Sequence, residues 1–203
     1  MKPIVWVADI GSVRKHNFAW CRDDSTVPRT GIDITRFAHG IANDLSHNHS
    51  VAIGFECPLF IPITESPQDL TDGRPGEGNR PWSAGAGSSS LTTGLAECVW
   101  IFEKLHTLAQ APLNPTFDWH TFTKGTANLF IWEAMITSST KGKSHPDDAQ
   151  IAAHTFWQHY PDIDQANTLT AVHPYSLVGA ALLRARLSTN LQLLFEPCIV
   201  IAP

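Results

Sequence analysis

Three carboxylates of this 203-residue chain each follow an apolar segment, at the point where a predicted β-strand ends. The acids are Asp9, Glu56 and Glu133, and the segments before them cover residues 4–8, 51–55 and 129–132. In an open α/β sheet, the carboxyl ends of neighbouring strands border the crevice in which ligands bind. Several carboxylates that converge there suit a hard divalent cation. The pattern therefore predicts a metal site; the alternative is that each acid only caps a local turn.

A site of this kind could hydrolyse a phosphodiester. That reaction needs an activated water and neutralisation of the attacking and leaving oxygens, and two ions of Mg²⁺ or Mn²⁺ about 4 Å apart supply both. We expect Asp9 to bridge the two ions, and Glu56 and Glu133 to hold one ion each from adjoining strands.

Several residues near the predicted strand ends could contact a phosphate. The glycine- and serine-rich residues 85–90, with Ser88 among them, precede a predicted helix, where free N–H groups bind anions or are simply capped. Arg74 and Arg80 belong to the loop before them and could clamp a phosphate through paired hydrogen bonds. Lys141 lies in the loop after the third apolar segment and could likewise bind a phosphate. The alternative for all three basic residues is a solvated side chain.

Hydrophobic patterning predicts strands and helices that alternate along the chain, which is the order of an α/β fold. The predicted strands are residues 3–10, 16–22, 51–56, 127–134 and 198–202, with a short strand within 23–32 and a short strand or irregular element at 117–122. The predicted helices are residues 33–48, 90–110, 146–159 and 174–187. Asp33 is the expected N-cap of the first, and Pro146 is at the first position of the third.

We expect a single domain over residues 1–203, with one irregular insertion at about residues 62–90. Glycine, proline and serine are frequent in this insertion, which favours a mobile flap beside the cleft or a disordered surface loop. Hydrophobic residues make up 43% and charged residues 16% of the chain, so a globular domain is favoured over disorder.

Charge and composition limit the partners. The formal net charge is −5 and no run of Lys or Arg is present, which weakens a nucleic-acid partner without excluding it; a nucleotide is the other possible partner. Four widely spaced cysteines disfavour a zinc site. We read no signal peptide and no apolar stretch of about 20 residues, so we expect no membrane partner and a cytoplasmic protein with reduced thiols, for which a homodimer is one option.

Two short motifs resemble a known superfamily. Residues 7–12 (Val-Ala-Asp-Ile-Gly-Ser) resemble the first-strand signature of the ribonuclease H-like fold. Residues 55–62 (Phe-Glu-Cys-Pro-Leu-Phe-Ile-Pro) are similar to the fourth-strand segment of the domain-of-unknown-function 429 family, a predicted ribonuclease H-like nuclease group. The resemblance implies a mixed sheet with helices on both faces. It also implies a nuclease or phosphodiesterase that depends on Mg²⁺ or Mn²⁺.

One departure from the family concerns its last helix, which usually brings further acids to the metals. Here Ser176 and Gly179 stand where the family has Asp. His173, or Asp147 or Asp148 from the preceding helix, could complete one ion's ligands or move a proton. If none of them does, a non-catalytic binding or scaffolding protein on the same fold is the alternative. The turn after Asp9 suggests a third option, a nucleotide-phosphate binder related to actin-like ATPases.

Overall fold

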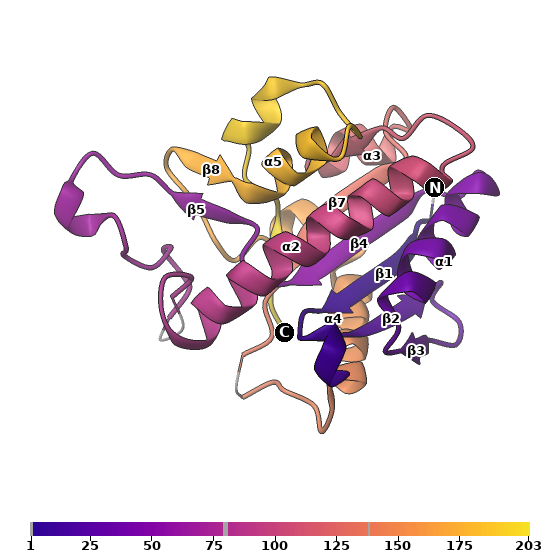
Figure 1. Cartoon of the computed structure of the whole chain (residues 1–203), viewed down its shortest axis with the longest axis horizontal. Helices are drawn as coiled ribbons and strands as arrows, with labels where there is room; N and C mark the ends of the chain where they lie inside the picture. Colours follow the sequence, from indigo (N-terminus) through magenta and orange to yellow (C-terminus); the bar gives the residue numbers. More distant parts are fainter. Residues whose placement is uncertain (1, 79–80, 138) are drawn as a thin grey trace.

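The computed structural model describes residues 2–78, 81–137 and 139–203, and within them the chain forms an α/β fold around a mixed seven-stranded sheet (Figure 1). Its strands run in the order β3-β2-β1-β4-β7-β6, and β9 also pairs with β7. β2 is antiparallel to both of its neighbours, β1 and β3, whereas β1, β4, β7, β6 and β9 run parallel. The strands are β1 (Ile4–Asp9), β2 (Ala19–Asp23), β3 (Arg29–Gly31), β4 (Val51–Glu56), β6 (Pro115–Thr116), β7 (Leu129–Ala134) and β9 (Val200–Ile201).

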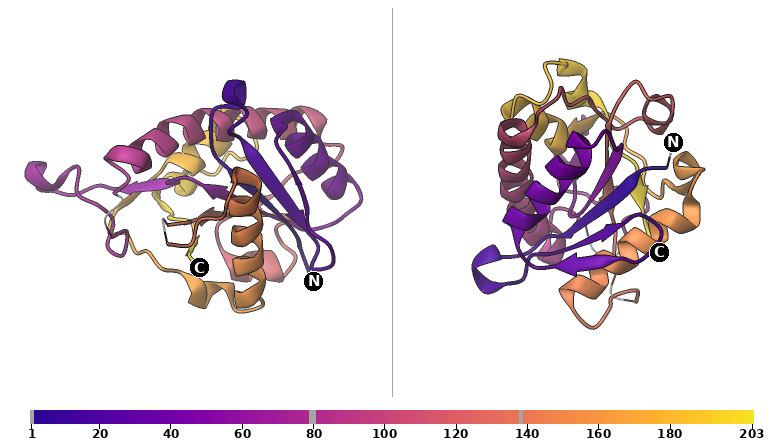
Figure 2. Two further views of the ribbon diagram at one scale, coloured as in Figure 1. Left: turned by 90° about the horizontal axis from the view of Figure 1, so that it is seen from below. Right: turned by 90° about the vertical axis from the view of Figure 1, so that its right-hand side faces the viewer.

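Helices cover both faces of the sheet, as the resemblance implied. Figure 2 shows α1 and α2 on one side of the strands and α4 on the other. The α-helices are α1 (Ile34–Ser46), α2 (Gly85–Leu108), α3 (Trp119–Thr123), α4 (His145–His159) and α5 (Leu177–Arg184). Short 3₁₀ helices are η1 (Val13–Lys15), η2 (Pro67–Asp69), η3 (Ile163–Ala166) and η4 (Leu191–Phe195). None of the described helices is long and apolar enough to cross a bilayer.

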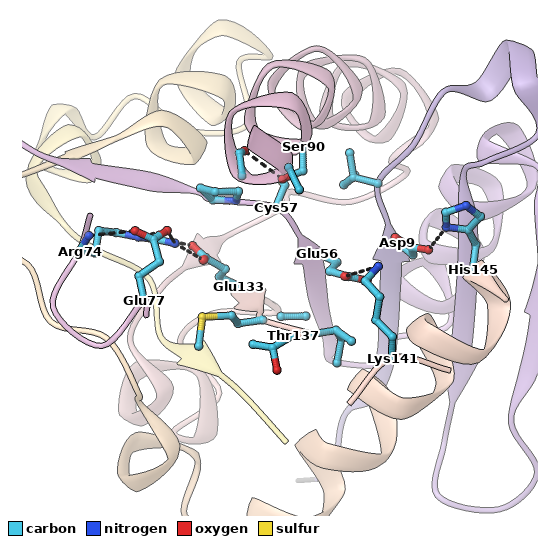
Figure 3. Close-up of a pocket in the computed structure, with 17 residues that line it drawn as sticks. Asp9, Glu56, Cys57, Arg74, Glu77, Ser90, Glu133, Thr137, Lys141 and His145 are labelled. Atoms are coloured by element: carbon cyan, nitrogen blue, oxygen red, sulfur yellow. Dashed lines mark hydrogen bonds and ion pairs between the residues drawn. The ribbon is translucent and has the colours of Figure 1, made fainter. Parts of the chain in front are cut away.

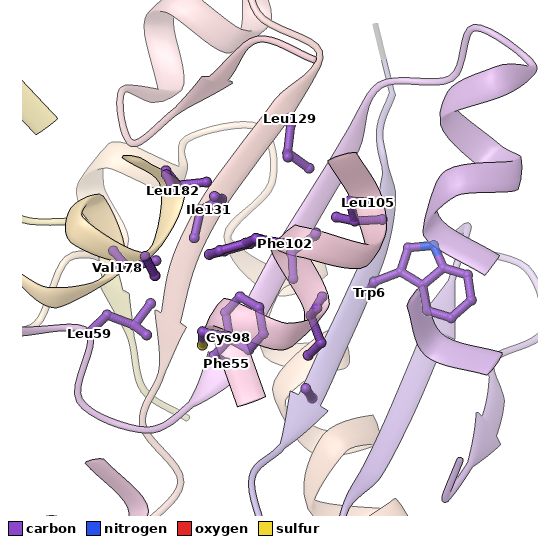
Figure 4. Close-up of a cluster of buried hydrophobic side chains, with 14 of the residues drawn as sticks. Trp6, Phe55, Leu59, Cys98, Phe102, Leu105, Leu129, Ile131, Val178 and Leu182 are labelled. Carbon is purple, nitrogen blue, oxygen red and sulfur yellow. The ribbon is translucent and has the colours of Figure 1, made fainter. Parts of the chain in front are cut away.

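The two faces have separate hydrophobic cores, because successive side chains of a strand point to opposite sides of the sheet. Trp6, Phe55 and Ile131 lie in the core beneath α1, α2 and α5 (Figure 4). Val7 and Trp132 lie in the opposite core, which α3 and α4 cover. The strands are apolar on both faces for this reason, which is typical of a parallel sheet between two helical layers.

Several predicted elements are confirmed at their starting residues. Asp33 caps α1 by accepting hydrogen bonds from the N–H groups of Thr35 and Arg36. The helix predicted from Pro146 begins one residue earlier, and Ser144 is its N-cap. Asp and Ser side chains favour this position because they bond the free N–H groups of the first turn.

Two other predictions were wrong in their boundaries. The helix predicted from residue 90 begins at Gly85, inside the segment expected to be irregular, which also contains η2. The helix predicted at residues 174–187 is split. Its first three residues form β8 (Pro174–Ser176), antiparallel to β5 (Phe60–Pro62), and α5 begins only after Ser176, whose hydroxyl accepts from Gly179 N–H. An apolar helical pattern thus conceals a short strand that pairs with residues more than a hundred positions away.

Candidate metal site

Asp9 and Glu56 lie side by side at the carboxyl ends of β1 and β4. They are direct partners in the parallel register, so their side chains point to the same face of the sheet. That face is the one covered by α4, whose first turn carries His145 and Asp148. These four residues together with Lys141, from the loop before α4, are called the acid cluster below.

Each acid in this cluster contacts a basic or N–H group, and Figure 3 shows the contacts of Asp9 with His145 and of Glu56 with Lys141. His145 Nδ1 lies 2.6 Å from Asp9 Oδ2. Lys141 Nζ lies 3.3 Å from Asp148 Oδ2 and 3.7 Å from Glu56 Oε1. Asp148 Oδ1 also accepts from Gly142 N–H at 2.6 Å. The loop before α4 and the first residue of α4 therefore bring one lysine and one imidazole to three carboxylates.

The carboxylates of the acid cluster lie close together, and two of them are buried. Asp9 and Asp148 are 3% and 4% exposed. Burial is the largest cause that raises the pKa values of Asp9 and Glu56 above their usual range; the charges of neighbouring carboxylates add to it, and the charge of Lys141 opposes it. Burial lowers the pKa of Lys141, but the charges of Glu56 and Asp148 outweigh it and raise that pKa above the usual value. One ammonium therefore faces up to three carboxylates.

A divalent cation fits this arrangement. Ligand atoms of Asp9, His145 and Asp148 all lie within 4.8 Å of one another. Glu56 Oε2 is buried and has no hydrogen-bond donor among the described residues, although its side chain touches Asp9. Two charged carboxylates cannot hydrogen-bond to each other, so this oxygen needs either a proton or a cation. Carboxylate oxygens together with one imidazole nitrogen are a donor set that suits Mn²⁺, and carboxylate oxygens alone suit Mg²⁺.

Glu133, the third predicted ligand, has a different environment. Arg74 Nη2 and Nη1 donate to its two oxygens at 2.6 and 2.8 Å, and Leu59 N–H donates at 2.9 Å. Arg74 also binds Glu77 through Nη2 and Nε at 2.9 and 3.2 Å. Arg74, Glu77 and Glu133 are called the arginine network. Glu133 lies at the strand end, as predicted, but a guanidinium already neutralises it.

The alternation of side chains along the strands explains this separation. Glu133 is the register partner of Phe55, one residue before Glu56. It therefore points toward the α2 side of the sheet, whereas Asp9 and Glu56 point toward α4. The carboxylates end neighbouring strands but leave the sheet on opposite faces.

A cavity of about 160 Å³ lies between the two groups. Asp9, Glu56 and Lys141 border one side, and Arg74 and Glu133 border the other (Figure 3). The first turns of α2 and the segment 134–137 after β7 complete the wall. Both groups of acids thus face one cavity, although only the acid cluster has carboxylates in contact with one another.

The other predicted contact residues have mixed outcomes. Arg74 is not a solvated loop residue, because it is 3% exposed and held by two carboxylates. Ser88 donates to Gly85 O within α2 and is not among the residues that line the cavity. His173 is an exposed residue next to β8 and does not line the cavity either. Arg80 lies outside the described residues, and Asp147 accepts from Lys143 N–H at the start of α4.

Three acidic or basic residues of the site region were missed. His145 precedes Asp148 by three positions, a spacing that places both on one helix face and could have revealed the pair. Glu77 follows Arg74 by the same spacing, but in a loop. Glu97 lies on the buried face of α2, where Gly11 N–H donates to it and Oε2 has no partner among the described residues. Burial raises the pKa of Glu97 to about 7.

Comparisons with known proteins identify no relative: no family model, curated protein or solved structure matches this chain. Its function must therefore be argued from the geometry and charge of the site.

Proposed function

We propose that this protein is a ribonuclease H-like phosphodiesterase or nuclease that depends on Mn²⁺ or Mg²⁺. The single observation that carries the proposal is the meeting of Asp9, Glu56, Asp148 and His145 from three distant parts of the chain, with ligand atoms of three of them within 4.8 Å. Asp9, Asp148 and His145 would hold the cation, and Glu56 would add an oxygen beside Asp9. Glu133 is the least suited of the predicted ligands, because Arg74 occupies both of its oxygens.

The order of elements supports the ribonuclease H-like part of the proposal. Three antiparallel strands come first, and crossovers through helices then add β4 and β7 in parallel to the side of β1 away from β2. The first acid ends β1, the second ends β4, and the third comes from a helix that packs on the sheet. The helix that supplies this acid is α4, so the substitutions at Ser176 and Gly179 do not remove it.

The residues of the cluster have distinct tasks in hydrolysis. A bound cation would activate water and neutralise charge on the phosphate. His145 Nδ1 is engaged with Asp9, and its ring is partly exposed, so it could hold the cation together with that carboxylate at the edge of the site. Lys141 is 39% exposed and can turn toward a phosphate oxygen.

A metal titration tests the proposal. We expect calorimetry to detect Mn²⁺ binding to the wild-type protein, and Asp9→Asn to weaken it at least about 100-fold, since even changes beyond the ligands commonly cost 10–100-fold. Glu65→Gln, at an exposed acid away from the cavity, is the matched control. Mn²⁺-dependent hydrolysis of bis(p-nitrophenyl) phosphate, DNA and RNA should disappear in Asp9→Asn. Equal binding by wild type and Asp9→Asn would exclude the acid cluster as the site.

The second candidate is a non-catalytic binding or scaffolding protein on the same fold. The observation that favours it is that Lys141 and His145 already pair with the three acids. Under this alternative, Mn²⁺ gives no heat with the wild-type protein.

A further inference from the structure

We infer that the substrate of this site is a small phosphodiester, of about dinucleotide size, and not an internal linkage of a nucleic-acid duplex. The inference rests on the proposed function and concerns which phosphate can reach the acid cluster. Three features of the cavity carry it: its volume, its walls and the charge of its lining.

The space beside the acids is small. At about 160 Å³ it is close to the size of an engineered protein cavity of about 150 Å³ that holds one benzene molecule. A phosphate group and the nearest part of one substituent fill such a space. The remainder of the substrate must extend out of the opening.

The walls place the acids below the surface. Asp9 is almost fully buried and borders the cavity, so a phosphate reaches it only by entering the cavity. Ala86 and Gly87 from α2 border the cavity together with Arg74 and residues 134–137. An internal phosphodiester of a duplex carries a base-paired nucleotide on each side, and both would have to pass these walls together. A small diester can bring its phosphate in with one substituent inside the opening.

The charge of the lining also disfavours a polyanion. Asp9, Glu56, Glu77 and Glu133 are its acids, and Asp148 lies directly beside them. Arg74 is paired with Glu77 and Glu133. Among the described residues of the lining, Lys141 is therefore the one lysine or arginine with an exposed side chain. Proteins that hold nucleic acid use several basic contacts to phosphates. One divalent cation and Lys141 can balance a single phosphate but not a strand of them.

The expected reaction on such a substrate is a hydrolysis that needs only water as the second reactant. The water oxygen bonds to phosphorus, the bond from phosphorus to one ester oxygen breaks, and that oxygen leaves with a proton. With thymidylyl-thymidine (TpT) the products are thymidine and thymidine monophosphate.

Binding and cleavage of TpT, compared with a 20-base-pair duplex, test the inference. We expect calorimetry on the Mg²⁺-loaded protein to detect TpT, and the duplex at equal phosphate concentration to compete at least tenfold more weakly. Mn²⁺-dependent cleavage should likewise favour TpT. Internal cleavage of the duplex, or equal competition by it, would overturn the inference.

A pair of variants on one helical turn sharpens the test. Ala86 is exposed and borders the cavity, whereas Ser89 is exposed and does not. Ala86→Leu should weaken TpT binding at least tenfold while Mn²⁺ affinity stays the same, and Ser89→Leu should change neither. If Mn²⁺ binds but TpT does not, or Ala86→Leu has no effect on TpT, the inference fails and the proposed function stands. Absence of Mn²⁺ binding in the wild-type protein would overturn both.

Discussion

The acid cluster and the arginine network place carboxylates at the ends of neighbouring strands, yet the two groups differ in their charge balance. Glu133 accepts two hydrogen bonds from one buried guanidinium. Glu56 has a buried oxygen with no donor among the described residues and touches another carboxylate. Both acids border the same cavity. Glu133 and Glu56 both lie at a strand end, but they differ in the groups that neutralise their charge.

The difference teaches that a strand-end acid is a candidate ligand only when its face of the sheet lacks a matching cation. A carboxylate bound by a guanidinium on both oxygens has little to offer a metal ion. Acids crowded together and removed from water keep an unfavourable charge, which a proton or a cation relieves. The arginine network is therefore interpreted as structural and the acid cluster as functional.

The largest expected effect comes from breaking the arginine network. Glu133→Gln leaves the buried Arg74 with one carboxylate fewer, and removal of one partner from a buried ion pair costs about 3–5 kcal/mol of unfolding free energy. Urea unfolding measures this loss. Glu103→Gln, which breaks the exposed pair with Arg184, should stay within about 1 kcal/mol of wild type.

Metal titration of the same variant can contradict the division into two groups. Folded Glu133→Gln should bind Mn²⁺ with wild-type affinity. A variant that keeps its fold but loses Mn²⁺ would return Glu133 to the metal site, as the spacing of acids along the sequence originally predicted.

Sequence patterning located the strand ends but not the faces on which their acids lie. Asp9, Glu56 and Glu133 each follow a strand that is apolar on both sides, so no alternation of polar and apolar residues marks the buried face. Which face an acid occupies depends on register, and a shift of one residue reverses it. Register between distant strands is set by tertiary packing, which explains why Glu133 was grouped with the other two acids.

Elements with local signals were predicted better than elements set by distant partners. The cap of α1 at Asp33 and the start of α4 near Pro146 follow from side chains next to the helix end. Residues 174–176 form a strand because β5 lies beside them, which no local pattern indicates. His173 was a candidate ligand because a helix was expected to begin beside it, whereas the histidine that contacts Asp9 is His145 on α4.

A smaller effect is expected at Glu97, a buried acid that has no cationic partner among the described residues. Glu97 is 8% exposed, and burial raises its pKa from 4.5 to about 7. Because the folded state holds this proton more tightly than the unfolded state, its stabilising contribution is complete below about pH 4.5 and is lost as pH rises through about 7. Glu97→Gln should therefore gain stability relative to wild type between pH 5 and pH 8, on the order of 3 kcal/mol.

Urea unfolding of Glu97→Gln and wild type at both pH values measures this difference, and any cost of the substitution that does not depend on pH cancels. Asp33→Asn is a suitable control, because it changes an exposed acid that caps α1. A difference of the same size at pH 5 and pH 8 would show that Glu97 carries no proton that the fold depends on.

The smallest expected effect concerns the cation inside the acid cluster. Lys141 contacts two acids, Glu56 and Asp148, as Arg74 contacts Glu77 and Glu133. The Lys141 side chain is 39% exposed and has a single nitrogen, whereas Arg74 is buried and binds a carboxylate through two nitrogens. An ammonium and a divalent cation compete for the same oxygens and repel each other. Lys141→Met should therefore tighten Mn²⁺ binding about fivefold, or about 1 kcal/mol after allowance for solvent screening.

Calorimetric titration of Mn²⁺ into Lys141→Met checks this, with Lys143→Met as the control because Lys143 is an exposed lysine of the same loop that does not border the cavity. Weaker Mn²⁺ binding in Lys141→Met would mean that the lysine holds the carboxylates in place, as Arg74 does in the arginine network. Tighter binding with slower hydrolysis would instead separate two tasks of Lys141. The lysine would compete with the metal for the carboxylates in the free site and would contact the phosphate once the metal is bound. The buried Arg74 cannot change its partners in this way.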